Sequence, residues 1–280
     1  MKKISRRSFL AAAGLSVAAL ALTACGGSSS SVASSVASSA AASSEAASTS
    51  AAAGELTTVE AGKLTMATNA AFPPYEMTTE AGEFEGIDIE TAQAIADKLG
   101  LELQIDDMDF DAALLSVQQG KADIVMAGVT VTDERKAVMD FSDSYATGIQ
   151  SIIVPEGSDI ASPDDLAGKK IGTQRGTTGY IYCSDDFGDE NVVAYDDGLT
   201  AVQALNNGQV DAVVIDNAPA KEFVAANPGL VILDTSYAEE DYAIGMAKGS
   251  SLEDAVNAAL EELKADGTLQ SIVDKYITAE

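Results

Sequence analysis

Two segments of this 280-residue chain, 115–127 and 203–215, carry the same pattern at an interval of 88 residues. Each has helical spacing that ends at a glycine, Gly120 or Gly208, followed by an aspartate and a short apolar run that predicts a buried strand. One explanation is that all α/β units share this pattern. We favour the other explanation, in which the chain contains two similar α/β lobes.

Short β-type runs alternate with helical patterns from residue 55 onward, which supports this interpretation. The expected strands are 63–68, 101–105, 123–127, 170–173, 192–195, 212–215 and 230–233, and the expected helices are 88–99, 112–119, one after Gly176, 199–206 and 218–226. Such alternation predicts parallel sheets flanked by helices. Ligands of open α/β sheets bind at the carboxyl ends of strands. Because the repeated strands are followed by Gly128 and Thr130 in one case and end near Asp216 in the other, we expect a cleft between the two lobes.

The first 54 residues indicate export and anchoring. A basic head precedes an apolar stretch that is shorter than the roughly 20 residues of a membrane span, and the stretch ends in Leu22-Thr23-Ala24-Cys25. This arrangement resembles a lipoprotein signal, so we expect 1–24 to be a signal peptide and Cys25 to be diacylated, with palmitate as an acyl group. The alternative is an uncleaved N-terminal anchor.

The export route is left open by the sequence. Residues 5–10 resemble a twin-arginine motif, but general secretory signals are often basic as well. Residues 25–54 contain the lipidated cysteine and a stretch rich in Ser and Ala, which is typical of a flexible tether. We therefore expect a domain held by its lipid at the extracytoplasmic face of the cell membrane, either at the cell surface or in the periplasm.

The composition excludes several functions. A net charge of -28 argues against nucleic acid as a partner, because phosphate binding depends on clusters of Lys and Arg. The absence of histidine removes Ser-His-Asp and Cys-His catalysis together with His-containing zinc sites. We predict no catalytic residue, no metal and no cofactor. With Cys25 lipidated, Cys183 is expected to be a buried thiol without a partner.

Six motifs occur in an order and spacing that resemble one family. They are 69–76 (NAAFPPYE), 86–89 (GIDI), 127–135 (AGVTVTDER), 140–145 (DFSDSY), 176–179 (GTTG) and 211–219 (DAVVIDNAP). Together they resemble the polar amino-acid-binding proteins of ABC importers, which are bacterial extracellular solute-binding proteins of family 3. The resemblance covers roughly residues 62–277. It implies a two-lobed periplasmic-binding-protein-like fold of type II, in which two α/β lobes joined by two crossing strands close around one free amino acid.

The strands that flank the second α/β unit predict where the chain crosses between lobes. Residues 149–154 and 242–247 have strand character, which places the crossings near 146–150 and 239–243. Lobe 1 is then expected to comprise 55–147 and 243–280, and lobe 2 to comprise 148–242. We expect a monomer, with residues 251–277 packed on lobe 1.

The resemblance implies a clamp for the two charged groups of a free amino acid. Arg135 would hold the α-carboxylate through two parallel hydrogen bonds, and Thr178, which opens a helix, would offer backbone N–H groups to it. Asp216 would hold the α-ammonium, assisted by Thr130 and Gly128. Alternatives stay open. Arg135 could be a surface cation, paired with Asp133 or Glu134, of a helix that Thr132 caps. The run at 176–179 could be an ordinary helix start, and Asp216 could be a helix cap.

The same resemblance assigns the ligand's side chain to four residues. Phe72 and Phe110 would form apolar walls, although either could simply belong to the core, and Asn69 and Gln174 would contact the end of the side chain. A neutral pair at these two positions favours an uncharged polar ligand such as glutamine. Arginine or lysine is the alternative, because Glu76 or Asp109 could serve a cation.

We therefore expect a binding protein without enzymatic activity, which captures an extracellular amino acid and delivers it to an ABC permease and ATPase complex. One alternative is a sensor that binds the ligand without transport. Another is an enzyme that uses carboxylates in the same cleft.

Overall fold

The computed structural model describes residues 56–277 of the protein. The predicted signal peptide at 1–24, the lipidation site Cys25 and the tether at 25–54 lie outside the described residues. Within 56–277, none of the helices has the length and the apolar character that crossing a membrane requires.

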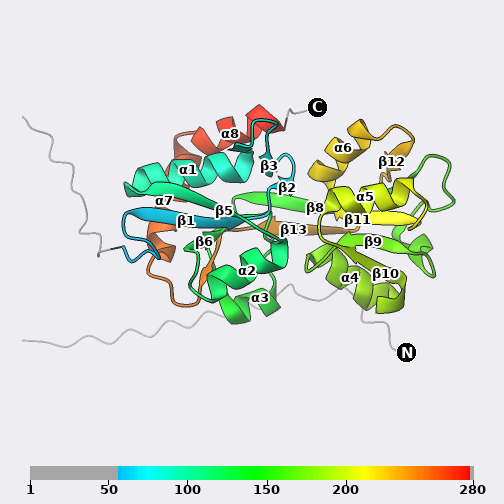
Figure 1. The fold of residues 1–280 in the computed structure, drawn as a ribbon, viewed down its shortest axis with the longest axis horizontal. Helices are drawn as coiled ribbons and strands as arrows, with labels where there is room; N and C mark the ends of the chain where they lie inside the picture. Colours follow the sequence, from blue (N-terminus) through cyan, green and yellow to red (C-terminus); the bar gives the residue numbers. More distant parts are fainter. Residues whose placement is uncertain (1–55, 278–280) are drawn as a thin grey trace, which may run out of the picture. The chain divides into compact units, whose positions relative to one another are not determined.

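The first sheet has five strands in the order β5-β1-β6-β14-β7. β1 lies between β5 and β6 and is parallel to both, whereas β14 is antiparallel to β6 and β7. Helix α1 contacts β1, β5 and the C-terminal helices α7 and α8, and α2 packs on β1, β6 and β14 (Figure 1). The bounds of these elements are β1 Lys63–Thr68, β5 Glu102–Asp107, β6 Ile124–Val125, β7 Met139–Phe141, β14 Gly245–Ala247, α1 Ile87–Leu99, α2 Phe110–Gln118, α3 Asp133–Val138, α7 Glu253–Ala265 and α8 Thr268–Tyr276.

The second sheet has the order β10-β9-β11-β8-β12, and β13 also pairs with β8. β9 is parallel to β10 and β11, while β8 is antiparallel to β11, β12 and β13. Helices α4, α5 and α6 contact these strands. The bounds are β8 Ala146–Pro155, β9 Ile171–Gln174, β10 Val192–Tyr195, β11 Ala212–Asp216, β12 Leu230–Ile232, β13 Ala238–Tyr242, α4 Thr178–Phe187, α5 Gly198–Asn206 and α6 Asn217–Ala226.

Three short strands and two short 3-10 helices complete the described part. The strands form a small antiparallel sheet in the order β2-β3-β4. Strand β3 begins at Glu76, which is buried and belongs to the site described below. The bounds are β2 Ala71–Phe72, β3 Glu76–Thr78, β4 Phe84–Glu85, η1 Pro163–Leu166 and η2 Asp189–Asn191.

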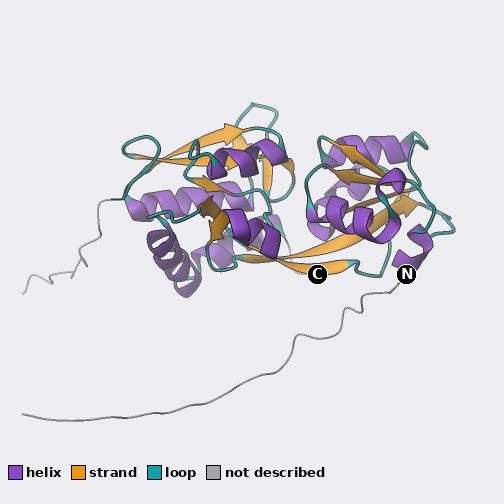
Figure 2. Ribbon diagram, turned by 90° about the horizontal axis from the view of Figure 1, so that it is seen from below, coloured by secondary structure: helices purple, strands orange, loops and turns teal. Residues whose placement is uncertain are grey.

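The paired strands β8 and β13 carry the chain between the two α/β parts. They pair antiparallel from Ala146, opposite Tyr242, to Gln150, opposite Ala238, and Figure 2 shows the pair extending from one part to the other. Helices α7 and α8, which follow the second crossing, pack on α1 of the first part. We keep the division into lobe 1 (55–147 and 243–280) and lobe 2 (148–242) as a proposal.

The predicted strand at 242–247 is wrong in one respect, because the structure divides it. β13 ends at Tyr242 and β14 begins at Gly245. Between them the Ala243 N–H donates to the Val129 carbonyl at 3.1 Å, and the Ile244 carbonyl accepts from the Ser142 N–H at 2.9 Å. The chain changes from one sheet to the other at these two residues. The continuous apolar run in the sequence gives no sign of this change in strand pairing.

Cys183 lies in the second part, in a cluster of buried apolar side chains that also includes Ile152 and Val214. Its side chain is fully buried and free. Burial raises the pKa of the Cys183 thiol to about 12, which keeps it protonated and unreactive. The prediction of a buried thiol is confirmed.

Candidate ligand-binding site

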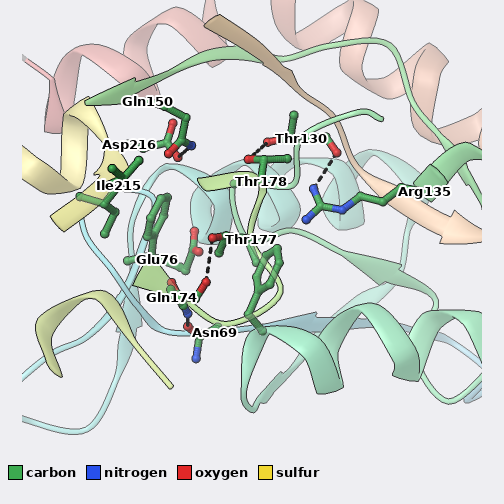
Figure 3. A pocket seen from close by; sticks show the side chains of 15 residues that line it. Asn69, Glu76, Thr130, Arg135, Gln150, Gln174, Thr177, Thr178, Ile215 and Asp216 are labelled. Carbon is green, nitrogen blue, oxygen red and sulfur yellow. Dashed lines mark hydrogen bonds between the residues drawn. The ribbon is translucent and has the colours of Figure 1, made fainter. Parts of the chain in front are cut away.

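A cavity is lined by residues from both α/β parts (Figure 3). Its wall contains all nine residues that the sequence analysis predicts as ligand contacts: Asn69, Phe72, Phe110, Gly128, Thr130, Arg135, Gln174, Thr178 and Asp216. The structure thus brings residues far apart in the sequence to one place. Their roles towards a ligand remain predictions. The other lining residues are Glu76, Ala127, Gln150, Thr177, Val214 and Ile215.

Arg135 on α3 provides the positive charge of the cavity. The Thr132 hydroxyl caps this helix, because it accepts a hydrogen bond from the Arg135 backbone N–H at 3.1 Å. The guanidinium donates to the Thr130 carbonyl at 2.8 Å and to the Gly176 carbonyl at 3.2 Å, and it lies 5.4 Å from the Phe110 ring centre. Since Arg135 is only 8% exposed, the alternative of a surface cation is wrong.

Only some of the N–H donors of the Arg135 guanidinium are used by the two carbonyl groups. Burial lowers the pKa of Arg135, but a guanidinium stays charged in proteins, and it carries five N–H donors. Two of these donors are used by the carbonyls of Thr130 and Gly176. The remaining donors can bind a carboxylate that enters the cavity.

Helix α4 begins beside Arg135. Its cap is Thr177, whose hydroxyl accepts from the Tyr180 N–H at 3.3 Å. Gly176 has φ +74°, a backbone conformation that favours glycine. The first N–H groups of a helix have no partner within the helix, and those around Thr178 can therefore meet an anion.

Asp216 ends strand β11 on another side of the cavity. Its Oδ2 accepts a hydrogen bond from the Gln150 amide at 2.7 Å, and the side chain is 7% exposed. Burial raises the pKa of Asp216 to about 7, although the nearby Tyr242 hydroxyl and the Gln150 amide oppose this shift. Asp216 precedes α6, but its side chain does not cap that helix. The alternative of a helix-capping aspartate is therefore wrong.

Glu76 adds a second acidic group, which the sequence suggested only as a possible cation contact. It is fully buried, and neither of its oxygens accepts a hydrogen bond from a donor of residues 56–277. Burial, followed by the charge of nearby Asp88 and by hydrogen bonding between the two carboxyl groups, raises the pKa of Glu76 well above its usual range. Asp109, the other candidate for a cation, is exposed and does not line the cavity.

Asp88 supports this corner of the cavity from helix α1. It accepts hydrogen bonds from the Gly128 N–H at 3.0 Å and the Tyr145 hydroxyl at 2.7 Å. Burial raises its pKa to about 6, while these donors oppose the shift. Asp88 thus accepts hydrogen bonds from two donors, whereas Glu76 accepts none from residues 56–277, which makes Glu76 the candidate partner for a cation in the cavity.

The neutral pair Asn69 and Gln174 closes another side. The Gln174 amide donates to the Asn69 Oδ1 at 2.8 Å and to the Asp196 carbonyl at 3.2 Å, and Asn69 donates to the Met108 carbonyl at 3.0 Å. Phe72 and Phe110 also line the cavity and are at most 8% exposed. Since the two amides bind each other, they leave fewer groups for a ligand than the sequence implied.

Two buried polar residues of the crossing strands were missed from sequence. Gln150 on β8 lines the cavity. Glu240 on β13 does not line it, but it accepts hydrogen bonds from three residues that do. A glutamine between the apolar residues of a predicted strand was a usable signal for Gln150. Glu240 lies between Glu239 and Asp241, and composition alone does not distinguish the three acids.

Comparison with known proteins identifies the family. Residues 64–279 match bacterial extracellular solute-binding proteins, family 3, and the chain belongs to this family. The L-cystine-binding protein TcyJ of Escherichia coli K12 is 33% identical over 226 residues, which cover 79% of this chain and 85% of that protein. Other relatives are named for binding histidine, arginine or glutamine.

Solved structures support the fold. An ancestral arginine-binding protein bound to arginine has a TM-score of 0.73 and 43% identity, covering 77% of this chain and 98% of that protein. An ancestral arginine-binding protein bound to glutamine has a TM-score of 0.74 and 42% identity, covering 78% of this chain and 99% of that protein. The predicted fold class, an α/β two-lobed periplasmic-binding-protein-like fold of type II, is confirmed.

Proposed function

We propose that this protein is the extracytoplasmic substrate-binding component of an ABC importer, which captures a free amino acid and delivers it to a membrane permease. The observation that carries this proposal is the pair Arg135 and Asp216, which are both buried in one cavity. A free amino acid carries a carboxylate and an ammonium, and each group is costly to bury unless it is paired. Arg135 and Asp216 supply these two partners, and the amino-acid-binding relatives support the same function.

Glu76 makes a cationic side chain the better ligand, and we propose arginine. A neutral ligand such as glutamine would leave Glu76 without an opposite charge, so this buried carboxyl group would have to stay protonated. A guanidinium supplies both the charge and several donors to the oxygens of Glu76. This reverses the preference for glutamine that the pair Asn69 and Gln174 suggested. Arginine-binding relatives and the ancestral protein bound to arginine support the proposal.

The export and anchoring predictions belong to the same proposal. A signal peptide at 1–24, a lipid with palmitate on Cys25 and a tether at 25–54 would hold the binding domain near its permease. A binding role without catalysis fits a cavity that is used for capture and release, and one protein molecule would deliver one ligand as a monomer.

Calorimetric titration of the purified protein with the twenty amino acids tests the ligand, and uptake of radiolabelled arginine by cells with and without the gene tests transport. We expect arginine to bind most tightly and its uptake to fall in cells that lack the gene. Tight binding of glutamine with weak binding of arginine would contradict the proposal of arginine and identify glutamine as the preferred ligand. Binding without any change in uptake would favour a sensor.

A further inference from the structure

Glu240 is the buried member of three consecutive acidic residues on β13. Glu239 and Asp241 are exposed, whereas Glu240 is 6% exposed. Side chains of a strand point alternately to opposite faces, so only the middle acid faces the interior between the crossing strands and the cavity. Burial of a carboxyl group is costly unless donors surround it.

Three donors converge on one oxygen of Glu240. Its Oε2 accepts hydrogen bonds from the Thr130 hydroxyl, the Thr178 hydroxyl and the Gln150 amide, each at 3.0 Å. Thr130 follows β6 in the first part, Thr178 opens α4 in the second part, and Gln150 lies on β8. All three donors line the cavity, and Glu240 itself lies behind them. Figure 3 shows Thr130 and Thr178 facing each other above the cavity, with Gln150 beside Asp216.

These bonds determine what the threonine hydroxyls can offer to a ligand. A hydroxyl has one hydrogen and two lone pairs. When Thr130 and Thr178 donate to Glu240, their oxygens are left with lone pairs, which can only accept. The contact between the two hydroxyl oxygens is longer, at 3.4 Å, and hydrogen bonds to a carboxylate are the stronger ones.

The amide of Gln150 is committed in the same way. It donates to Asp216 at 2.7 Å and to Glu240 at 3.0 Å, which accounts for its two hydrogens. The wall made by Thr130, Thr178, Gln150 and Asp216 thus presents acceptors and no side-chain donors. These side-chain acceptors suit an ammonium group, while the backbone N–H groups at the start of α4 remain the donors for a carboxylate.

We propose that Glu240 is a positioning residue for the ligand's α-ammonium group. It orients the hydroxyls of Thr130 and Thr178 as acceptors, holds the Gln150 amide against Asp216, and adds a negative charge behind this wall. The inference rests on the proposed function, because it requires an amino-acid ligand. It assigns a role to a residue that does not itself line the cavity.

The charge of Glu240 also acts on the opposite end of the clamp. Burial lowers the pKa of Arg135, and the Glu240 carboxylate opposes that shift. Glu240 therefore attracts an ammonium and weakens the attraction of Arg135 for a carboxylate. Removing the charge of Glu240 should therefore weaken the binding only of ligands that carry an α-ammonium group.

The test is Glu240→Gln, with Glu239→Gln as the matched control on the exposed face of the same strand. In Glu240→Gln the amide oxygen can occupy the place of Oε2 and keep its three donors, so the variant mainly removes charge. The ligands are arginine and 5-guanidinopentanoate, which has the same guanidinium and carboxylate but lacks the α-ammonium. Glutamine and its des-amino analogue form a second pair. Affinities come from calorimetry, and weak analogues are measured by displacement of the bound amino acid.

We expect Glu240→Gln to weaken amino-acid binding about tenfold, the difference between hydrogen bonds to a charged and a neutral group. Binding of the des-amino analogue should stay within about threefold of wild type or become tighter, and Glu239→Gln should change neither. Equal losses for both ligands would mean that Glu240 only maintains structure, and unchanged amino-acid binding would remove it from the site. Both results overturn the inference and leave the proposed function intact. If wild-type protein binds no amino acid, the proposed function itself is refuted, and the inference fails with it.

Discussion

The substitution Glu76→Gln should shift the ligand preference of the cavity from arginine towards glutamine. The variant Glu76→Gln has nearly the same shape and removes the buried carboxyl group that has no donor among residues 56–277. If the ligand is arginine, its guanidinium is the partner of this carboxylate. Removing one member of a buried, hydrogen-bonded charge pair costs about 2–5 kcal/mol.

The expected loss for arginine lies near the lower end of that range. Asp88 remains beside the substituted position, and its charge continues to attract a cation. A loss of about 2 kcal/mol corresponds to about 30-fold in the dissociation constant. Glutamine should behave differently, because a neutral ligand no longer requires a protonated carboxyl group at residue 76. We expect its affinity to be unchanged or up to about tenfold higher.

Calorimetry with arginine and glutamine measures both effects in one series. Glu80→Gln is the control, because Glu80 is an exposed acid in the turn after β3 that does not line the cavity, and this variant removes an acidic group as well. Arginine affinity within threefold of wild type in Glu76→Gln would refute the assignment of Glu76 to the ligand's cation. Equal losses for both amino acids would instead point to a structural role.

Three other outcomes are expected. Arg135→Ala should weaken every accepted amino acid at least about tenfold in calorimetry, since the α-carboxylate loses its partner; near-native affinity would place the carboxylate elsewhere. Cys25→Ser should release the protein from membranes without altering ligand binding, as membrane fractionation and titration would show; a variant that resists high-salt washing must have another anchor. Because burial raises the pKa of Asp216 to about 7 from its ordinary 3.8, the folded form favours the proton, so its contribution to stability is full below about pH 4 and is lost as pH rises towards 7. Thermal unfolding of the ligand-free protein at pH 5 and pH 8 should therefore differ less in Asp216→Asn than in wild type, and an equal difference would contradict the shift.

Most of the fold followed from local patterns in the sequence. The strand at 63–68 and the helix that ends at Leu99 have the period and the glycine stop that their elements require, and both occur in the structure. The break between Tyr242 and Gly245 could not be predicted in this way. It depends on which sheet each residue pairs with, and pairing between distant strands leaves no local pattern.

The candidate site, like the fold, could be predicted from the sequence only in part. Arg135, Thr178 and Asp216 were identified because motifs fixed their positions, and the structure places them around one cavity. The mutual hydrogen bond of Asn69 and Gln174 was not foreseen, since it joins residues 105 apart in the chain. The sequence names the residues that can reach a ligand, but only the fold shows which of them already bind each other.

The balance of buried charge is the reason that we propose a cationic ligand over the uncharged one that the sequence favoured. Four acids, Glu76, Asp88, Asp216 and Glu240, lie buried in or next to the cavity wall, against the single guanidinium of Arg135 among the residues that line the cavity. A zwitterion such as glutamine brings no net charge, so it leaves this excess of acid as it was. Arginine brings one further positive charge into the same space, and the raised pKa values of Glu76 and Asp88 show how costly uncompensated negative charge is there. We therefore expect this acidic cavity to gain more from a cationic side chain than from an amide, although Asn69 itself is neutral.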